Sequence, residues 1–192
     1  MHYDRERVVG RMRKWETYLN EHALPTWERL PGLDLYMDQV VALVNNYLGF
    51  LPKEVGMDAV VTSAAVNNYV RKKIMPPPVK KRYSRVHLAY LLMICSLKHS
   101  VSISYIQQMI PLTLTEDEVH RIYNAFVEQH RRTTLYFVEQ VNEVASRLLA
   151  EGETHDAGVS NIVTAFAVVS GLSRMAAEKL ILMQEPEQIT TE

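Results

Sequence analysis

Apolar residues recur at helical spacing along most of the chain, and this pattern predicts a mostly α-helical protein. Each predicted helix has an apolar face and an opposite polar face. Breaks between helices are marked by Pro25, by Pro31-Gly32 and by a loop over residues 49–56. The predicted helices cover residues 4–20, 34–47, 62–73, 85–99, 102–110 and 116–150, with further helical segments after residue 158.

The first predicted helix carries a basic face opposite its apolar one. Val8, Met12, Trp15 and Leu19 fall on the apolar side at intervals of three and four residues. The basic face is either the solvated surface of a packing helix or an auxiliary contact to phosphate. Its cations are Arg5, Arg7, Arg11, Arg13 and Lys14.

Short polar residues indicate where the middle helices begin. Asp34 is a candidate N-cap for the second helix, and Thr62 or Ser63 for the third. Ser84 precedes a long apolar helix whose inner face includes Leu88, Leu91, Leu92, Ile94 and the single Cys95. A buried cysteine behaves as a small hydrophobic residue, so Cys95 is predicted to lie in the core. Ser102 is expected to cap the helix that Pro111 ends.

The longest predicted helix runs from Glu116 to Ala150 and begins with a cluster of acidic residues, as helix starts favour. At 1.5 Å per residue it spans about 52 Å, longer than a small domain, so its apolar stripe needs a partner. Two partners are possible: a second copy of the chain, or residues 158–184 folding back. A linker is expected at Glu151-Gly152 and residues 155–158, and an interruption at Ser170-Gly171.

Charge is distributed very unevenly along the chain. The 192 residues carry 21 basic and 22 acidic side chains, yet residues 59–115 contain no aspartate or glutamate. Eight cations lie in that window, so the remainder has 13 basic and 22 acidic residues, a net charge of −9. A basic segment in a near-neutral chain indicates a localised anionic partner. The eight cations are Arg71, Lys72, Lys73, Lys80, Lys81, Arg82, Arg85 and Lys98.

The helix at 62–73 presents a polar face within this window. Ala65, Val66, Tyr69 and Val70 form its inner side, which leaves Asn67, Asn68, Arg71 and Lys72 facing outward. Asparagine pairs bidentately with adenine, and arginine with guanine, in the major groove of DNA. The face therefore either contacts bases and phosphates or is simply solvated. After it, the prolines at 76–78 force an extended path, and residues 79–83 suit one arm of a small basic β-wing.

This order of elements resembles the DNA-binding domain of the mercury-resistance regulator (MerR) family. NNYVRKKIMPPP resembles the end of that family's recognition helix and its Gly-Leu-x-Pro-Pro, and KKRYS resembles its wing. SLKHSVSISYIQQMI is similar to the turn between its later helices. The match covers about fifty residues. The wider pattern, over about residues 31–112, resembles a bacterial family of unknown function that carries this domain.

The resemblance implies a mostly α fold, a MerR-like winged helix-turn-helix with a minimal β-wing. The expected divisions are an N-terminal helix and linker (1–30), the winged helix-turn-helix (31–112) and a C-terminal helical region (113–192). It implies that Tyr69, Arg71, Arg82 and Tyr83 contact the DNA backbone or form the wing, although Tyr83 is equally suited to pack the wing on the core. In that family a long helix dimerises, so a homodimer through residues 116–150 is expected.

The predicted function is a transcriptional regulator that binds double-stranded DNA through residues 62–73 and the basic wing at 76–84. The alternative is an interaction or assembly module with a degenerate helix-turn-helix. It arises because Asn67-Asn68-Tyr69 replaces the family's usual Arg-Tyr-Tyr and because the C-terminal half is predicted to be helical. The wing is also shorter than in that family and lacks its glycine. The predicted DNA-binding residues are Ser63, Asn67, Asn68, Tyr69, Arg71, Lys72, Lys73, Lys80, Lys81, Arg82, Tyr83 and Arg85.

Motifs of catalysis and cofactor binding are absent from the sequence. It contains no GxGxxG, P-loop, GxSxG, HExxH or CxxC pattern, so neither an enzyme nor a cofactor is expected. The seven histidines are scattered, and no metal site is predicted. A small effector could bind among the C-terminal helices, although plain core is the simpler interpretation. One cysteine and an N-terminus without an apolar signal segment favour the cytoplasm.

Overall fold

The computed structural model describes residues 4–21, 23–51, 58–150 and 155–183. Most of these residues are helical. The all-α prediction is confirmed, because the described residues form helices and isolated β-bridges but no β-strand. No helix in this part of the chain is both long enough and apolar enough to cross a membrane. The helices are α1 (Arg5–Glu21), α2 (Met37–Tyr47), α3 (Ser63–Arg71), α4 (Arg85–Leu97), α5 (Ile103–Met109), α6 (Glu116–Ala150) and α7 (His155–Leu182), with a 3-10 turn η1 (Trp27–Arg29).

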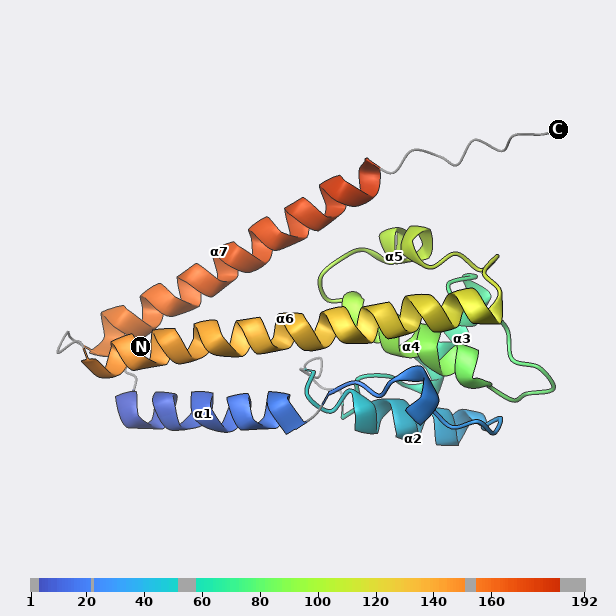
Figure 1. Cartoon of the computed structure of the whole chain (residues 1–192), viewed down its shortest axis with the longest axis horizontal. Helices are drawn as coiled ribbons and strands as arrows, with labels where there is room; N and C mark the ends of the chain where they lie inside the picture. The colour runs from blue at the N-terminus through green and yellow to red at the C-terminus, as the bar shows by residue number, and fades with distance from the viewer. Residues whose placement is uncertain (1–3, 22, 52–57, 151–154, 184–192) are drawn as a thin grey trace.

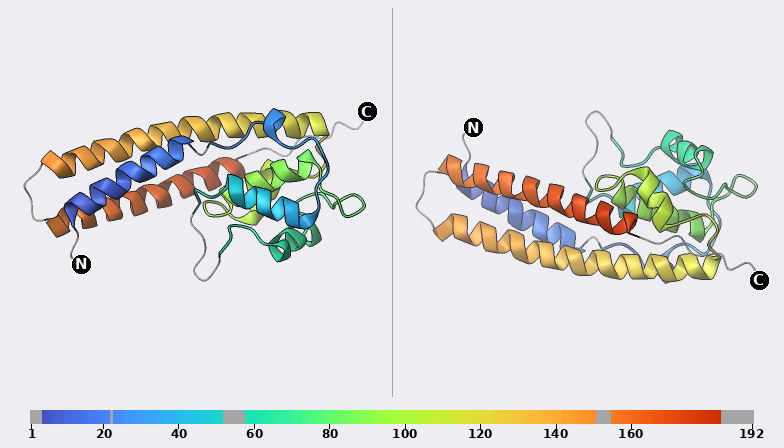
Figure 2. Two further views of the ribbon diagram at one scale, coloured as in Figure 1. Left: turned by 90° about the horizontal axis from the view of Figure 1, so that it is seen from below. Right: turned by 90° about the horizontal axis from the view of Figure 1, so that it is seen from above.

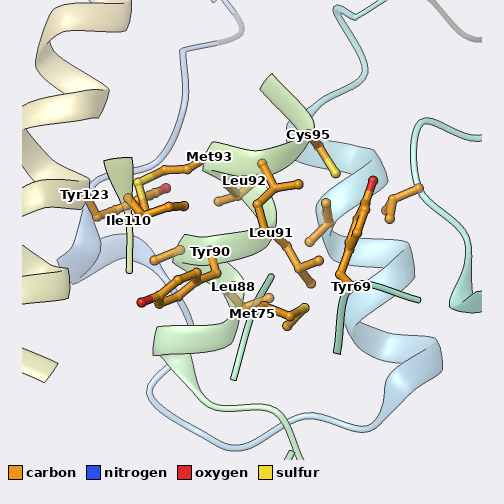
Figure 3. Packing of buried hydrophobic residues seen from close by; sticks show 14 of the residues in the cluster. Tyr69, Met75, Leu88, Tyr90, Leu91, Leu92, Met93, Cys95, Ile110 and Tyr123 are labelled. Carbon is orange, nitrogen blue, oxygen red and sulfur yellow. The ribbon is translucent and has the colours of Figure 1, made fainter. Parts of the chain in front are cut away.

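Helix α4 is the centre of the core. Every residue from His87 to Cys95 is buried, because α2, α5 and α6 all pack against it. A helix that is apolar all round is what such an enclosed position requires. Figure 3 shows Leu91 and Leu92 of α4 between Tyr69 of α3 and Tyr123 of α6. The buried position of Cys95 is confirmed, and burial raises the pKa of its thiol to about 11.

The core closes through a segment that precedes the expected domain. The main cluster of buried residues begins at Leu24 and ends at Val127, wider at both ends than residues 31–112. Tyr123 Oη donates a buried hydrogen bond of 2.8 Å to the Pro25 carbonyl, and Trp27 N donates to Asn124 Oδ1 at 2.9 Å. Trp27 also stacks on His120, with ring centroids 5.0 Å apart. The segment around η1 is therefore fastened to the first half of α6.

Helix α6 runs the length of the molecule and joins two packing regions (Figure 1). Helices α2 to α5 gather around its first half, whereas α1 lies along its second half. Phe137 of α6 contacts Trp15 of α1 and Phe166 of α7, at centroid distances of 5.5 and 5.7 Å. The apolar stripe of α6 is thus covered within the chain, by α1 and α4 above all.

Three expected boundaries were wrong. The second helix begins at Met37 rather than Asp34, because Leu35 pairs with Tyr83 instead and Tyr36 becomes the N-cap. The linker expected at residues 155–158 is the start of α7, and Glu151-Gly152 lies outside the described residues. Ser170-Gly171 does not interrupt α7, since one glycine inside a long helix costs only about 1 kcal/mol.

Candidate nucleic-acid interface

Helix α3 presents the predicted polar face to solvent. Thr62 is its N-cap, and the Thr62 hydroxyl accepts a hydrogen bond from Ala65 N at 3.2 Å. Ser63, Asn67 and Arg71 are exposed, and Asn68 is half-buried. Arg71 Nη2 donates to Asn68 Oδ1 at 2.9 Å, one turn earlier on the helix. Asn68 therefore orients the guanidinium of Arg71, whose other donors remain available to a ligand.

The end of α3 is closed by a tight turn that displays two lysines. Ile74 N donates to Tyr69 O at 2.8 Å and Lys73 N to Val70 O at 3.0 Å, the pair of bonds of a Schellman motif. Gln107 of α5 donates to the carbonyl of Lys73 at 3.1 Å, which anchors this turn from outside the helix. Lys72 and Lys73 are both exposed. Their ammonium groups thus extend the cationic end of α3 from a fixed backbone.

A two-residue hairpin follows the proline run. We call residues 79–82 the basic hairpin. Val79 and Arg82 exchange backbone hydrogen bonds of 3.0 and 2.9 Å, while Lys80 and Lys81 form the turn with φ angles of 50° and 64°. Positive φ at both central residues is the geometry of a type I′ turn. Lys80, Lys81 and Arg82 are all exposed. Figure 2 shows this hairpin projecting at the end of the molecule that also holds α3.

The base of the basic hairpin is held rigidly. Leu35 and Tyr83 exchange backbone hydrogen bonds of 2.9 Å in both directions. Buried His87 accepts from Ser84 N through Nδ1 at 3.0 Å, and its Nε2 lies 3.0 Å from the Pro77 carbonyl. The accepting role of Nδ1 places the proton on Nε2, so His87 donates to Pro77. The histidine therefore ties the start of α4 to the proline run that leads into the hairpin.

Tyr36 supports the basic hairpin, although no pattern in the sequence points to this residue. Arg82 Nη2 donates to Tyr36 Oη at 2.9 Å, and the Arg82 guanidinium carbon lies 4.5 Å from the centroid of the Tyr36 ring. Leu33 is 80% exposed and Val79 is 69% exposed. Only the pairing of Leu35 with Tyr83 brings these positions together, so sequence spacing alone could not reveal them.

Three predicted DNA-binding residues do not belong to this surface. Tyr69 and Tyr83 are buried, because their rings fill the core beneath α3 and the basic hairpin (Figure 3 for Tyr69). Of the two roles expected for Tyr83, the structure shows the one in which its ring packs the hairpin on the core. Arg85 is half-buried and turns toward the N-terminal segment, where its guanidinium carbon lies 5.6 Å from the centroid of the Trp27 ring. The predicted DNA-binding residues that are exposed are Ser63, Asn67, Arg71, Lys72, Lys73, Lys80, Lys81 and Arg82.

The backbone at the lysines is strained. Lys73, Lys80 and Lys81 are the non-glycine residues with positive φ in the described part of the chain. Residues other than glycine and asparagine adopt this left-handed backbone conformation at a cost on the order of 1 kcal/mol each. Strain of this kind gathers at functional sites, where a side chain is needed in spite of it. Glycine would suit all three positions better, yet each one carries an ammonium group.

The basic N-terminal helix does not belong to the surface formed by α3 and the basic hairpin. Asp34 and Asp38 are exposed and each lies two residues from Tyr36 in the sequence. Helix α1, which carries Arg11 and Lys14, lies toward the opposite end of the molecule from the basic hairpin (Figure 2). Nowhere among the described residues do three or more His, Cys, Asp or Glu side chains gather in a way that could hold a metal ion.

A cavity of about 130 Å³ lies where α1 ends against the middle of α6. His130 lies in its wall, with its ring centroid 5.5 Å from that of Phe50 and 6.0 Å from that of Phe126. Burial in these surroundings lowers the pKa of His130 below its ordinary value of 6.5. The volume is too small for most cofactors. The lining residues are Leu19, Ala23, Phe50, His130, Arg131, Thr134 and Leu135.

We expect His130 to make stability depend on pH. The folded chain holds the neutral form, so the unfolded chain binds more protons as pH falls below about 6.5. The free energy of unfolding should therefore be highest above that pH and fall below it. His130→Leu removes this part of the pH dependence, measurable as urea midpoints at neutral and acidic pH. Thr134→Val, in the same cavity, should retain it; equal pH dependence in wild type and His130→Leu would contradict the assignment.

Comparison with known proteins places the chain by sequence. Residues 25–126, 102 of the 192, match a family described as Domain of unknown function (DUF1836). No curated protein and no solved structure matches the chain. The family resemblance expected from the sequence is confirmed only for a family of unknown function; no match to mercury-resistance regulators is found. The matched range runs from the Pro25 that accepts from Tyr123 to Phe126, close to the limits of the main buried cluster.

Proposed function

This chain belongs to the DUF1836 family, and we propose that it binds duplex DNA through α3 and the basic hairpin. The observation that carries the proposal is the strained, lysine-bearing hairpin at the same end of the molecule as the amide- and arginine-bearing helix α3. Both elements lie at one end of the molecule (Figure 2) and come from the window without aspartate or glutamate. The resemblance of NNYVRKKIMPPP and KKRYS to a winged helix-turn-helix supports the same function.

The dimensions of α3 suit the major groove. An α-helix with its side chains is about 10–12 Å across and the major groove of B-DNA is about 12 Å wide, so the nine-residue α3 fits into the groove. Asn67 is exposed on this helix, and Arg71 is held by Asn68. These side chains would read base edges, whereas the lysines of the hairpin would neutralise phosphates on the flanking strand. Rigid anchoring by His87 and Tyr36 lowers the entropy lost when the hairpin binds.

Selection from a random pool of duplex DNA tests whether α3 reads sequence. Wild-type protein should enrich a short motif, and Asn67→Ala should relax the preference at one position while retaining the rest. Ala64→Ser, which changes an exposed residue in the first turn of the same helix, serves as the control. A pool without enrichment, retained equally by wild type and Asn67→Ala, would reject base recognition by this helix.

A protein-interaction or assembly module is the second candidate. The internal hydrogen bond between Arg71 and Asn68 favours it, because part of the polar face already satisfies itself. Under this function the basic hairpin would contact an acidic protein surface. Binding of a purified acidic polypeptide in place of duplex DNA, lost in Lys80→Ala/Lys81→Ala, would favour this candidate over the first.

A further inference from the structure

Helix α7 leaves a long apolar face uncovered. Its inner side, with Ile162, Phe166, Ala177 and Ile181, turns toward α6 and α5, and these residues are partly or fully buried. A groove of about 550 Å³ separates α7 from the turn between α4 and α5, so the helix is only loosely covered. Figure 1 shows α7 diverging from α6 along its length. The exposed large apolar residues of α7 and its end are Val163, Val168, Val169, Leu172, Met175, Leu180, Leu182 and Met183.

The uncovered face has the spacing of a coiled coil. One stripe repeats at intervals of three and four residues for more than two heptads, and all its members are exposed. It lies about opposite the inner side of α7, since each residue advances the helix by about 100°. A stripe with this period packs against the matching stripe of another helix better than against a flat surface. Its members are Ala165, Val168, Leu172, Met175, Lys179 and Leu182.

We propose that this stripe packs against the same stripe of a second copy of the chain, with the two α7 helices antiparallel. An antiparallel pair with its two-fold axis between Leu172 and Met175 places Ala165 opposite Leu182 of the partner subunit. Val168 then lies opposite the aliphatic stem of Lys179 of the partner subunit. Leu172 lies opposite Met175 of the partner subunit. The first two layers join a smaller side chain to a larger one, and the third joins two of similar volume, so the layers pack to comparable thickness.

Lysine excludes the parallel arrangement. In a parallel pair in register, Lys179 would meet Lys179 of the partner subunit inside the interface. Two like charges held together away from water are strongly unfavourable. In the antiparallel pair each ammonium group reaches the rim beside Val168 of the partner subunit. The single polar residue in the stripe therefore sets the orientation.

The size of the stripe suits a reversible dimer. Its 18 residues span about 27 Å, and half the circumference of a cylinder about 10 Å wide is about 16 Å. The outer half of this part of α7 thus offers on the order of 430 Å² per partner, or roughly 860 Å² in total, which is the size of a transient interface. The proposed pair uses α7 in place of the long helix at residues 116–150 that the sequence suggested, because α1 and α4 pack on much of α6. This inference does not depend on DNA binding.

Sedimentation of the full chain tests the interface. Wild type should be a dimer at micromolar concentration, and Leu172→Glu should raise its dissociation constant at least about ten-fold, because a carboxylate would be buried. Val163→Glu is the matched control: Val163 is 57% exposed and Leu172 60%, but Val163 lies off the stripe. Circular dichroism confirms that both variants fold. A wild-type monomer, or equal dissociation of the two variants, would overturn the proposal.

Charge substitution tests the orientation. Val168→Glu places its carboxylate near Lys179 of the partner subunit, so the dimer should persist. The double variant Val168→Glu/Lys179→Glu brings carboxylates together and should dissociate. In a parallel dimer Val168→Glu alone would dissociate, and that result would overturn the antiparallel arrangement. A wild-type oligomer larger than two would also overturn the two-fold pair.

Discussion

Lys80→Gly/Lys81→Gly should make the protein more stable and make it bind DNA less well. Both residues adopt positive φ, which glycine accepts without steric cost, so Tm should rise by a few degrees, for about 1 kcal/mol gained. The same change removes two ammonium groups from the tip of the basic hairpin. Loss of two phosphate contacts near physiological salt lowers affinity on the order of 10- to 50-fold. Thermal denaturation and fluorescence anisotropy with labelled duplex measure the two effects.

Alanine at the same positions separates charge from strain. Lys80→Ala/Lys81→Ala removes the charges but keeps a Cβ at positive φ, so affinity should fall equally while Tm does not rise. If the glycine variant lost stability, the turn geometry would be wrong. If it kept full affinity, the lysines would have no part in binding, and the strain at the turn would need another cause.

Trp27→Ala should cost about 3–5 kcal/mol of unfolding free energy, as removal of a fully packed aromatic ring does. Trp27 is 5% exposed and contacts the rings of His120 and Tyr123 and the guanidinium of Arg85. Its loss frees the segment that holds Pro25 against Tyr123, so α6 should detach from α4 at its first half. Urea denaturation followed by circular dichroism measures the change.

Trp15→Ala is the control for this prediction, because the chain has two tryptophans in contrasting positions. Trp15 is 42% exposed on α1 and makes an edge contact with Phe137. Its removal should cost about 1 kcal/mol. Equal losses in the two variants would show that the segment before α2 is not part of the main core.

The helices of this fold could be predicted from local pattern, and the caps at Thr62 and Ser84 could be too. Apolar spacing located α1, α3, α4 and α6 to within a few residues, since amphipathic periodicity is a local property. The charge window located the basic hairpin in the same way. The start of α2 was misplaced because a tertiary pairing of Leu35 with Tyr83 overrides the capping tendency of Asp34.

Long-range partners could not be predicted. Nothing in the sequence shows that Tyr36 holds Arg82 or that Arg85 turns away to Trp27, because these contacts join residues 46 and 58 positions apart. The two buried tyrosines have the same chemistry as exposed DNA-contacting ones, and only packing distinguishes them. Likewise the sequence predicts two helices with a break at Ser170-Gly171, whereas the structure has one continuous helix α7, which carries the exposed stripe.

Salt dependence of duplex binding tests the central claim most directly. Each phosphate neutralised contributes about −0.9 to the slope of log Kobs against log salt concentration, so the six exposed cations of α3, the turn after it and the basic hairpin predict a slope of about −5. Lys80→Ala/Lys81→Ala should bring the slope closer to zero by about 2, whereas Arg11→Ala/Lys14→Ala, on α1 at the other end, should leave it unchanged. A slope near zero for wild type, or equal changes in the two double variants, would contradict DNA binding by this surface.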